Sequence, residues 1–317
     1  MRAMILAAGL GSRMQPLSDL RAKPALPILG MPLIAILLEL LRAHGVRDVL
    51  INLHASADSI RQAVTAFAPD GMQIHWSLER QPLGTGGGIR RAASFLSKSE
   101  ACIVLAGDML LDIDLGAALE RHRQRGARIS LLLRDDPRSA RFGSIGIDAH
   151  ARVRRIGSRF DLGAESAAGL FPSVRIFSRS ALRNWPRAEA FEDLSDWIAP
   201  QLEAGADDIY GDLLGAGDCT WEPVGTPREY LRANLETPRL RYLGEAELLR
   251  RSGARRFGDA VIGSGARIPS STSVRRCVVW QGETLPANER FVDGVYACGT
   301  FHACGGEPTG PRGKARK

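Results

Sequence analysis

The sequence predicts an α/β protein, in which a three-layer domain with a mostly parallel sheet precedes a short C-terminal parallel β-helix. Strand-like and helix-like segments alternate through residues 1–135, and several of the strand-like segments are apolar throughout. Such strands are typical of a parallel sheet that helices cover on both faces. Apolar residues also recur every six positions at Ile262, Ile268, Val274 and Trp280, which favours the β-helix.

The first third of the chain is expected to supply the parallel sheet and its helices. Apolar or alternating runs predict the strands, and apolar residues at helical spacing predict the helices, with Gly45 and Gly126 as helix stops. The expected strands are 1–8, 46–53, 72–78, 101–108 and 127–135, and the expected helices are 32–45, 56–68, 87–96 and 115–126.

The middle of the chain changes character and is interpreted as an insertion that adds strands to the edge of the sheet. Residues 142–156 predict a hairpin, and 169–178 predict a further strand. A helix at 191–205, a strand at 219–225 and a helix at 227–235 are expected to close the domain. The predicted domains are therefore residues 1–240, a hexapeptide-repeat-like domain at 241–300, and a basic disordered tail at 301–317. A pair of irregular hairpins is the alternative for the second domain.

Composition and charge limit the functional classes. The chain has 317 residues, of which 44% are hydrophobic and 24% charged, as in ordinary globular proteins. Its 42 Lys and Arg residues against 35 Asp and Glu residues suit an anionic ligand. No nucleic-acid-binding pattern accompanies the charge, so nucleic acid is not an expected partner. The longest apolar run, residues 32–41, is too short to span a bilayer, so no membrane association is expected.

The cysteines and the N-terminus indicate a cytoplasmic protein. Five scattered cysteines predict free thiols in a reducing compartment, and the N-terminal apolar run lacks the features of a secretory signal. Cys298, His302 and Cys304 lie close together but without a CxxC pair, so ordinary side chains are favoured over a zinc site.

The stretch Gly9 to Pro24, "GLGSRMQPLSDLRAKP", predicts an anion-binding loop. Counting from Gly9 or Gly11 does not produce the GxxxxGK[ST] phosphate loop. The dinucleotide fingerprint also fails, because Met14 occupies its third glycine position. Two glycines let backbone N–H groups approach an anion, while Arg13 and Lys23 supply charge. Prolines around both cations stiffen the loop, which favours this interpretation over a solvated surface loop.

Four motifs in order resemble the sugar-phosphate nucleotidylyltransferases, nearest their mannose-1-phosphate guanylyltransferase branch. "LAAGLGSRMQPLSDLRAKPALPILGMPLI" is similar to LAAGxGxRxxPLTxxxPKPLxPVxGxPLI, and "ERQPLGTGGGIRRA" to ExxPLGTAGAxxxA. "VLAGDMLLDIDL" is similar to VxNGDxLxDxDL, and "WEPVGTPREYLRAN" to WxDVGTPxxYLxAN. The resemblance covers essentially residues 1–300. It implies a Rossmann-like nucleotidyltransferase domain with a left-handed C-terminal β-helix, and a cytoplasmic enzyme that makes an NDP-sugar.

The resemblance also implies the site. An NTP and a sugar 1-phosphate would react to give the NDP-sugar, here perhaps GDP-linked, and pyrophosphate. Arg13 would hold the β- and γ-phosphates, Lys23 would neutralise the reacting phosphates, and Asp108 would ligate Mg²⁺ as the cofactor. The implied nucleotide-binding residues are Ala8, Gly9, Gly11, Glu79, Gly84, Thr85 and Gly87. Homo-oligomers are usual where such a β-helix domain is present.

Several positions depart from the family pattern. The position of the family's second metal-binding aspartate is occupied by Pro223. Glu222, one residue earlier, is a weak candidate ligand, because only a bulge would turn it toward the metal. Arg159 keeps the charge expected to meet the sugar phosphate, but the usual neighbouring glutamate is Ser158. Phe171 and Ser173 replace the asparagine and glycine that the family usually has in its sugar pocket. A regulatory subunit that binds a nucleotide or NDP-sugar with little catalysis is therefore the alternative function.

Overall fold

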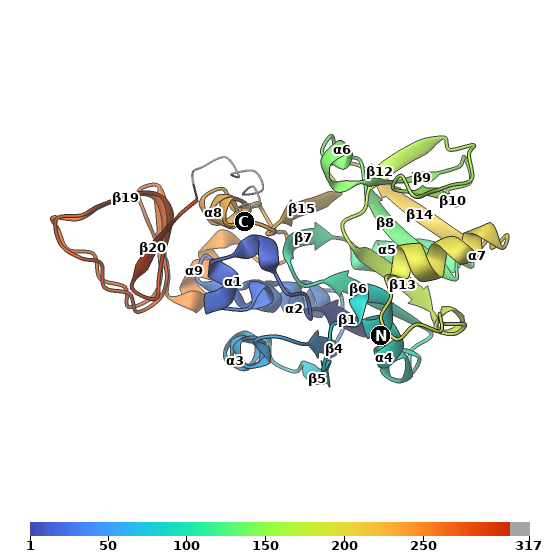
Figure 1. The fold of residues 1–317 in the computed structure, drawn as a ribbon, viewed down its shortest axis with the longest axis horizontal. Helices are drawn as coiled ribbons and strands as arrows, with labels where there is room; N and C mark the ends of the chain where they lie inside the picture. The colour runs from blue at the N-terminus through green and yellow to red at the C-terminus, as the bar shows by residue number, and fades with distance from the viewer. Residues whose placement is uncertain (305–317) are drawn as a thin grey trace, which may run out of the picture.

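A computed structural model describes residues 1–304 (Figure 1). A mixed eleven-stranded sheet with helices on both faces forms the body of the molecule, and a separate five-stranded sheet forms one end. Within the described residues, no helix combines the length and the apolar character that crossing a membrane requires.

The parallel part of the large sheet comes from the first third of the chain, as predicted. Its strand order is β6 (Ala101–Ala106), β1 (Arg2–Leu6), β4 (Asp48–Leu53) and β5 (Gln73–Leu78), and all neighbouring pairs are parallel. β1 therefore lies between two parallel neighbours, and the segment that follows it emerges at the carboxyl edge of the sheet. Ligands of open α/β sheets bind at this edge.

The two faces of the sheet carry different helices, and the side chains of β1 alternate between them. Ala3 and Ile5 pack into the core shared with α2 (Leu33–Ala43) and α3 (Ala57–Phe67). Met4 packs into the core on the other face, which Ile89, Ala92 and Leu96 of α4 help to form. α4 spans Gly84–Leu96, and α5 spans Leu115–Gln124. The three-layer arrangement is thus confirmed.

The other half of the sheet comes from the middle of the chain. β13 (Val174–Ser178) lies antiparallel between β6 and β8 (Ile129–Arg134). The predicted hairpin is confirmed as β9 (Ser144–Ile147) and β10 (Val153–Ile156). The remaining strands of this half are β11 (Phe160–Asp161), β12 (Ala167–Leu170) and β14 (Ile209–Leu214). The middle region therefore extends the sheet on the side of β6.

Three of the predicted elements take a different form in the structure, and β14 was not predicted at all. The single strand predicted at 169–178 is two strands, because Ser173 adopts a left-handed backbone with φ of 57° between β12 and β13. The strand predicted at 101–108 ends earlier, as β6 at Ala106, and a separate strand, β7 (Met109–Ile113), follows it. β7 pairs with β15 (Cys219–Pro223). The helix predicted at 191–205 begins as a π-helix, η4 (Asp193–Ile198), and continues as α7 (Ala199–Glu203).

Short elements connect these layers. After β1 come η1 (Ser12–Met14), α1 (Leu17–Leu20), η2 (Lys23–Ala25), β2 (Pro27–Ile28) and β3 (Met31–Pro32). Later in the chain are α6 (Ser139–Phe142) and η3 (Arg179–Ala181). α8 (Pro227–Leu235) begins where the Thr226 hydroxyl accepts from the Glu229 N–H, and α9 (Glu245–Ser252) follows it.

The C-terminal sheet has a parallel centre and antiparallel ends. β17 (Ala260–Ile262), β18 (Ser273–Val279) and β19 (Arg290–Ala297) are parallel, while β16 (Arg255–Phe257) and β20 (Thr300–Ala303) pair antiparallel at the two ends. Val261 pairs with Val278, and Val278 with Val295, so successive parallel strands are offset by 17 residues. A left-handed β-helix is not confirmed, because only three strands follow the parallel course.

The predicted boundary between the second domain and the tail falls inside a strand. β20 includes residues 301–303, which the sequence analysis assigned to the tail. The rest of that predicted tail, residues 305–317, lies outside the described residues.

Candidate active site

A cavity of about 440 Å³ lies at the carboxyl edge of the parallel strands. β1 and β6 end in it at Leu6 and Ala106, and β4 contributes Asn52, the residue before its last. It collects most of the predicted site residues: Ala8, Gly9, Gly11, Arg13, Lys23, Glu79, Gly84, Thr85 and Asp108 all line it. The fold thus brings together motifs that lie far apart in the sequence.

The loop after β1 forms one wall of this cavity. Its first turn is tied to the sheet, because Ala7 N–H donates to Asn52 Oδ1 over 2.7 Å. Gly11 has φ of 66°, a left-handed conformation that glycine adopts without strain. Met14 is fully buried and anchors the loop, whereas the exposed Arg13 faces the cavity. The loop therefore combines an anchored backbone with an accessible guanidinium.

Lys23 and Asp108 meet inside the cavity although 85 residues separate them. Lys23 Nζ lies 2.7 Å from Asp108 Oδ2, with side-chain exposures of 10% and 44%. The Asp108 carbonyl accepts from Val224 N–H over 3.1 Å, which brings the loop after β15 beside this pair. One cation and one anion therefore lie side by side, with the carboxylate open to the cavity.

Glu79 lies at the base of the cavity and is buried. Its Oε1 accepts from Asn52 Nδ2 over 2.7 Å, and its Oε2 accepts from Leu83 N–H over 3.1 Å. Both carboxylate oxygens are thus used within the protein. Through Asn52, Glu79 also positions the Ala7 N–H at the start of the loop after β1. Glu79 therefore positions Asn52 and the backbone around it, and its carboxylate is not free to bind a ligand.

The glycines at the start of α4 pack against the 189–193 segment. A Cβ on Gly84 would lie 2.5 Å from the Phe191 carbonyl oxygen, and a Cβ on Gly86 2.3 Å from the Phe191 ring. Gly87 is not among the cavity-lining residues; its Cβ position faces the Glu189 carbonyl. The GTGGG sequence therefore permits close contact between α4 and this segment.

A buried polar network continues from Thr85 into the protein. Thr85 Oγ1 lies 2.7 Å from Glu192 Oε2 and 2.5 Å from Asp193 Oδ1. Asp193 pairs in turn with Arg175 through two hydrogen bonds, and both side chains are almost fully buried. The guanidinium of Arg175 also stacks over the Phe171 ring at 4.8 Å.

A second cavity, of about 480 Å³, adjoins the first. The two cavities share Thr85, Ser173, Arg175 and Glu192 as lining residues. Arg159 lines only the second cavity, together with Phe160 and Phe171. The sequence analysis did not single out Asn52, Arg175 or Glu192. A signal for Arg175 exists, since it is a lone charge inside the apolar run "SVRIF".

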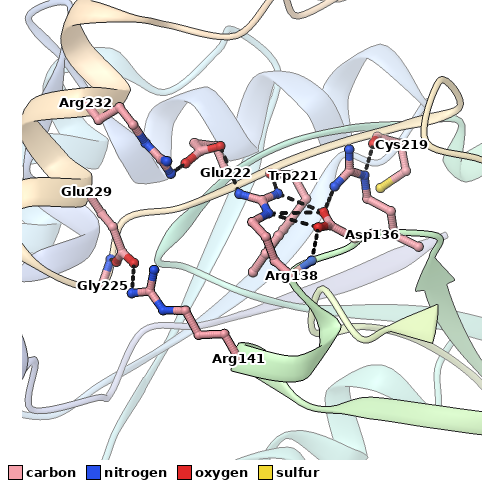
Figure 2. Close-up of polar contacts among 10 residues, drawn as sticks. Asp136, Arg138, Arg141, Cys219, Trp221, Glu222, Gly225, Glu229 and Arg232 are labelled. Atoms are coloured by element: carbon pink, nitrogen blue, oxygen red, sulfur yellow. Dashed lines mark hydrogen bonds and ion pairs between the residues drawn. The ribbon is translucent and has the colours of Figure 1, made fainter. Parts of the chain in front are cut away.

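Glu222 is not brought to Asp108, so the structure gives no support to its selection as a metal ligand. Figure 2 shows it between two arginines: Oε2 lies 3.3 Å from Arg138 Nη1, and Oε1 pairs with Arg232. Burial lowers the pKa of both guanidinium groups from the ordinary arginine value. The reason is the regular alternation of β15: Pro223 lies opposite Met109 without the bulge that would turn Glu222 around.

Further ion pairs near Glu222 stabilise the loop after β15, which lies beside the cavity. Arg138 also pairs with the buried Asp136 over 2.8 Å (Figure 2). Arg141 Nη2 lies 2.7 Å from Glu229 Oε1, while Glu229 Oε2 accepts from Gly225 N–H over 2.9 Å. Glu229 thus holds the loop that passes Lys23 and Asp108.

A family model, described as nucleotidyl transferase, matches residues 2–239. The chain belongs to the nucleotidyl transferase family. It is 27% identical over 245 residues to a UTP–glucose-1-phosphate uridylyltransferase of Synechocystis, covering 74% of this chain and 62% of that relative. It is 28% identical over 299 residues to a mannose-1-phosphate guanylyltransferase of Mycobacterium tuberculosis, covering 90% and 81%.

A solved structure supports the same assignment. The crystal structure of HddC from Yersinia pseudotuberculosis complexed with GMP-PN has a TM-score of 0.62 to this nucleotidyl transferase, at 25% identity. The match covers 75% of this chain and 99% of that one. Family and relatives together assign the chain to the sugar-1-phosphate nucleotidyltransferases, as its motifs predicted.

Proposed function

We propose that this nucleotidyl transferase joins GTP and a sugar 1-phosphate to give a GDP-sugar and pyrophosphate, with Mg²⁺ as cofactor. The observation that carries this proposal is the pair of adjoining cavities. The first holds the glycine loop, Arg13, Lys23 and Asp108, which suits a triphosphate. The second holds Arg159 and suits a sugar phosphate. Their shared wall is where the two substrates would meet.

The reaction would proceed by in-line displacement. A phosphate oxygen of the sugar 1-phosphate attacks the α-phosphorus of GTP, and the bond from that phosphorus to the α,β-bridging oxygen breaks. Arg13 holds the β- and γ-phosphates and stabilises the charge of the leaving pyrophosphate. Lys23 neutralises the reacting α-phosphate. Arg159 holds the incoming phosphate. Charge stabilisation and positioning of this kind are the main catalytic devices of phosphoryl and nucleotidyl transfer.

The residues present suit a divalent cation that is shared with the substrate. Asp108 offers a cavity-facing carboxylate, and Pro223 offers no ligand. Residues 1–304 contain no group of three His, Cys, Asp or Glu side chains that could hold a metal. Mg²⁺ commonly binds through one or two carboxylates plus substrate phosphates, so Asp108 would hold it together with the triphosphate. When bound, it would supply charge neutralisation at the phosphates.

Guanine is the base proposed because the mannose-1-phosphate relative is a guanylyltransferase and the solved neighbour was complexed with GMP-PN. A manno-configured sugar is proposed on the same relative. All five cysteines are free, which supports a reducing compartment, and we propose the cytoplasm. Self-association through the C-terminal sheet is a further expectation, which sedimentation analysis would test.

Pyrophosphate release is the measurement that tests this function. The protein would be assayed with Mg²⁺, each of the four NTPs and dTTP, against hexose and heptose 1-phosphates. We expect release with GTP and a manno-configured sugar 1-phosphate. Arg13→Ala and Asp108→Ala should each lower kcat/KM by about 100-fold or more. Arg123→Ala and Asp70→Ala, at exposed positions away from the cavities, are the matched controls. Wild-type rates in folded Arg13→Ala protein would overturn the proposal.

A regulatory subunit is the second candidate, because Pro223 removes the second acid and Glu222 is engaged by arginines. It predicts nucleotide binding by calorimetry with no pyrophosphate release for any pairing. Turnover with any sugar 1-phosphate would rule it out.

A further inference from the structure

The segment that carries Arg13 and Lys23 does not pair with the large sheet. Between β1 and α2 it contains only short helical turns and the two-residue strands β2 and β3, which pair with each other. Its order therefore comes from side-chain packing and from hydrogen bonds to other elements. Six of its apolar side chains are fully buried, as is Leu33 at the start of α2, whereas Leu10 and Leu20 are exposed; the six are Met14, Leu17, Leu26, Ile28, Leu29 and Met31.

These side chains share one hydrophobic core with the C-terminal sheet. The same cluster contains Tyr230 and Leu231 of α8 and Leu248 of α9. It also contains Val261, Val278, Trp280, Val295, Ala297 and Cys304 from the C-terminal region. In Figure 1, α1, α8 and α9 lie between the large sheet and the C-terminal sheet. The second domain therefore completes the core beneath the catalytic segment.

Trp280 contacts that segment before Lys23 directly and after it through Tyr230. Its ring lies 4.7 Å from the guanidinium carbon of Arg21, two residues before Lys23. Its Nε1–H donates to Tyr230 Oη over 3.0 Å, and Tyr230 O–H donates to the Pro27 carbonyl over 2.8 Å. Burial raises the pKa of Tyr230, so the phenol keeps the proton for this bond. Trp280 is 3% exposed and sits immediately after β18.

Other contacts clamp the turn that follows. Asn234 Oδ1 accepts from Leu29 N–H over 2.8 Å, and Ser252 Oγ donates to the Leu29 carbonyl over 2.7 Å. A Cβ on Gly30 would lie within 2.8 Å of Ser252 and Ala254. The segment after Lys23 is thus held from the side of α8 and α9, while Trp280 links it to the C-terminal sheet.

We propose that Trp280 is a positioning residue for Lys23, so that the C-terminal sheet tunes catalysis by holding the lysine beside Asp108. This inference rests on the proposed function for its kinetic consequence. A displacement of about 1 Å at a charged catalytic group can cost about 100-fold in rate. Because Lys23 acts on the reacting phosphates, its misplacement lowers kcat more than it weakens NTP binding.

The test uses the full chain with Trp280→Ala, Trp280→Phe and a matched control, Phe291→Ala. Phe291 is a buried aromatic of the C-terminal sheet, 9% exposed, in a core that contains none of the catalytic segment. Arg21→Ala removes the ring contact without opening the core, so it serves where Trp280→Ala does not fold. Hydrogen exchange is read at the N–H groups of Ala25 and Leu26, which close the turn at Lys23.

We expect exchange at Ala25 and Leu26 to accelerate about tenfold in Trp280→Ala and Arg21→Ala, and to stay unchanged in Phe291→Ala. We expect kcat to fall about tenfold in Trp280→Ala with little change in the KM for NTP, and Trp280→Phe to recover part of the loss. In a Lys23→Ala background, Trp280→Ala should cost almost nothing further, because the pair acts as one unit.

Unchanged exchange at these amides in folded Trp280→Ala or Arg21→Ala protein would overturn the inference. So would an equal loss of kcat in the presence and absence of Lys23. The exchange measurement needs no turnover, so wild-type protein that is inactive with every substrate pairing would contradict the proposed function while exchange still decides the inference.

Discussion

The pair of Lys23 and Asp108 shows what single residues contribute to this site. The Asp108 side chain is 44% exposed, so water screens the ion pair and its contribution to stability is small. Replacing either residue should therefore leave the fold intact. The ion pair contributes to function instead, because it places an ammonium group and a carboxylate together in a cavity suited to phosphates, where both charges remain available to a ligand.

Pro223→Asp is the residue-scale prediction. Position 223 lies opposite Met109, next to Asp108, so an aspartate there adds a second carboxylate beside the proposed metal. We expect the Mg²⁺ concentration for half-maximal activity to fall about tenfold, since a second carboxylate strengthens binding of a hard cation. Titration of pyrophosphate release with Mg²⁺ measures this. Pro223→Asn is the uncharged control, and an equal effect in both variants would contradict the explanation.

Contact between α4 and the 189–193 segment is the main feature at the scale of elements. Gly86 N–H and Gly87 N–H both donate to the Phe191 carbonyl, at 3.0 and 3.2 Å. The start of the helix is thus satisfied by the protein itself. This contact also forms the wall between the two cavities, because Thr85 and Glu192 belong to it. The glycine sequence is therefore explained by packing as much as by ligand approach.

Gly86→Ala tests this packing. Alanine favours a helix by about 1 kcal/mol over glycine, but here its Cβ would overlap the buried Phe191 ring. We expect net destabilisation of about 1–3 kcal/mol, because overpacking costs that much in a close-packed core. Urea unfolding measures the change. Gly217→Ala, at a position with nothing within 4 Å, is the control. A more stable Gly86→Ala protein would show that this contact is loose.

At the scale of the whole molecule, hydrophobic cores connect the large sheet, its helices and the C-terminal sheet. The C-terminal sheet packs into the core beneath the catalytic segment, while two further cores cover the faces of the large sheet. Buried polar side chains join the layers. His122 of α5 is the clearest case: Nε2 lies 2.9 Å from Ser178 Oγ on β13, and Nδ1 2.8 Å from Ser130 Oγ on β8. Ser178 Oγ donates to the Ala127 carbonyl, so the imidazole donates to Ser178 from Nε2.

Stability of the whole molecule should fall in mild acid. Burial, with a smaller effect of Arg123, lowers the pKa of His122 from 6.5 to about 4. The unfolded chain therefore binds a proton that the folded chain excludes, and the free energy of unfolding decreases as pH falls from about 6.5 to about 4. The loss amounts to about 3 kcal/mol. Urea unfolding across this range measures it, and His122→Gln should flatten the slope. An unchanged slope in His122→Gln would contradict this origin.

Strands made of continuous apolar residues were predictable, and strands defined by their partners were not. β1, β4 and β6 follow directly from their apolar runs, as does the hairpin of β9 and β10 from its turn residues. β14 was missed because "IYGDLL" contains a glycine and an aspartate. Gly211 is required there, since a Cβ would meet Leu133 and Ile147, and Asp212 is paired with Arg121. The first reason lies in neighbouring strands and the second in the helix α5.

The sequence by itself determined the family, the parallel half of the sheet and the loop with Arg13 and Lys23. These depend on local order and spacing, which one chain displays directly. Only the tertiary structure decided which charges meet. It bonded both oxygens of Glu79 to Asn52 and Leu83, and it turned Glu222 toward Arg138 and Arg232. It also packed Trp280 beneath the catalytic segment. Contacts between residues distant in sequence arise from how layers pack, so no local pattern records them.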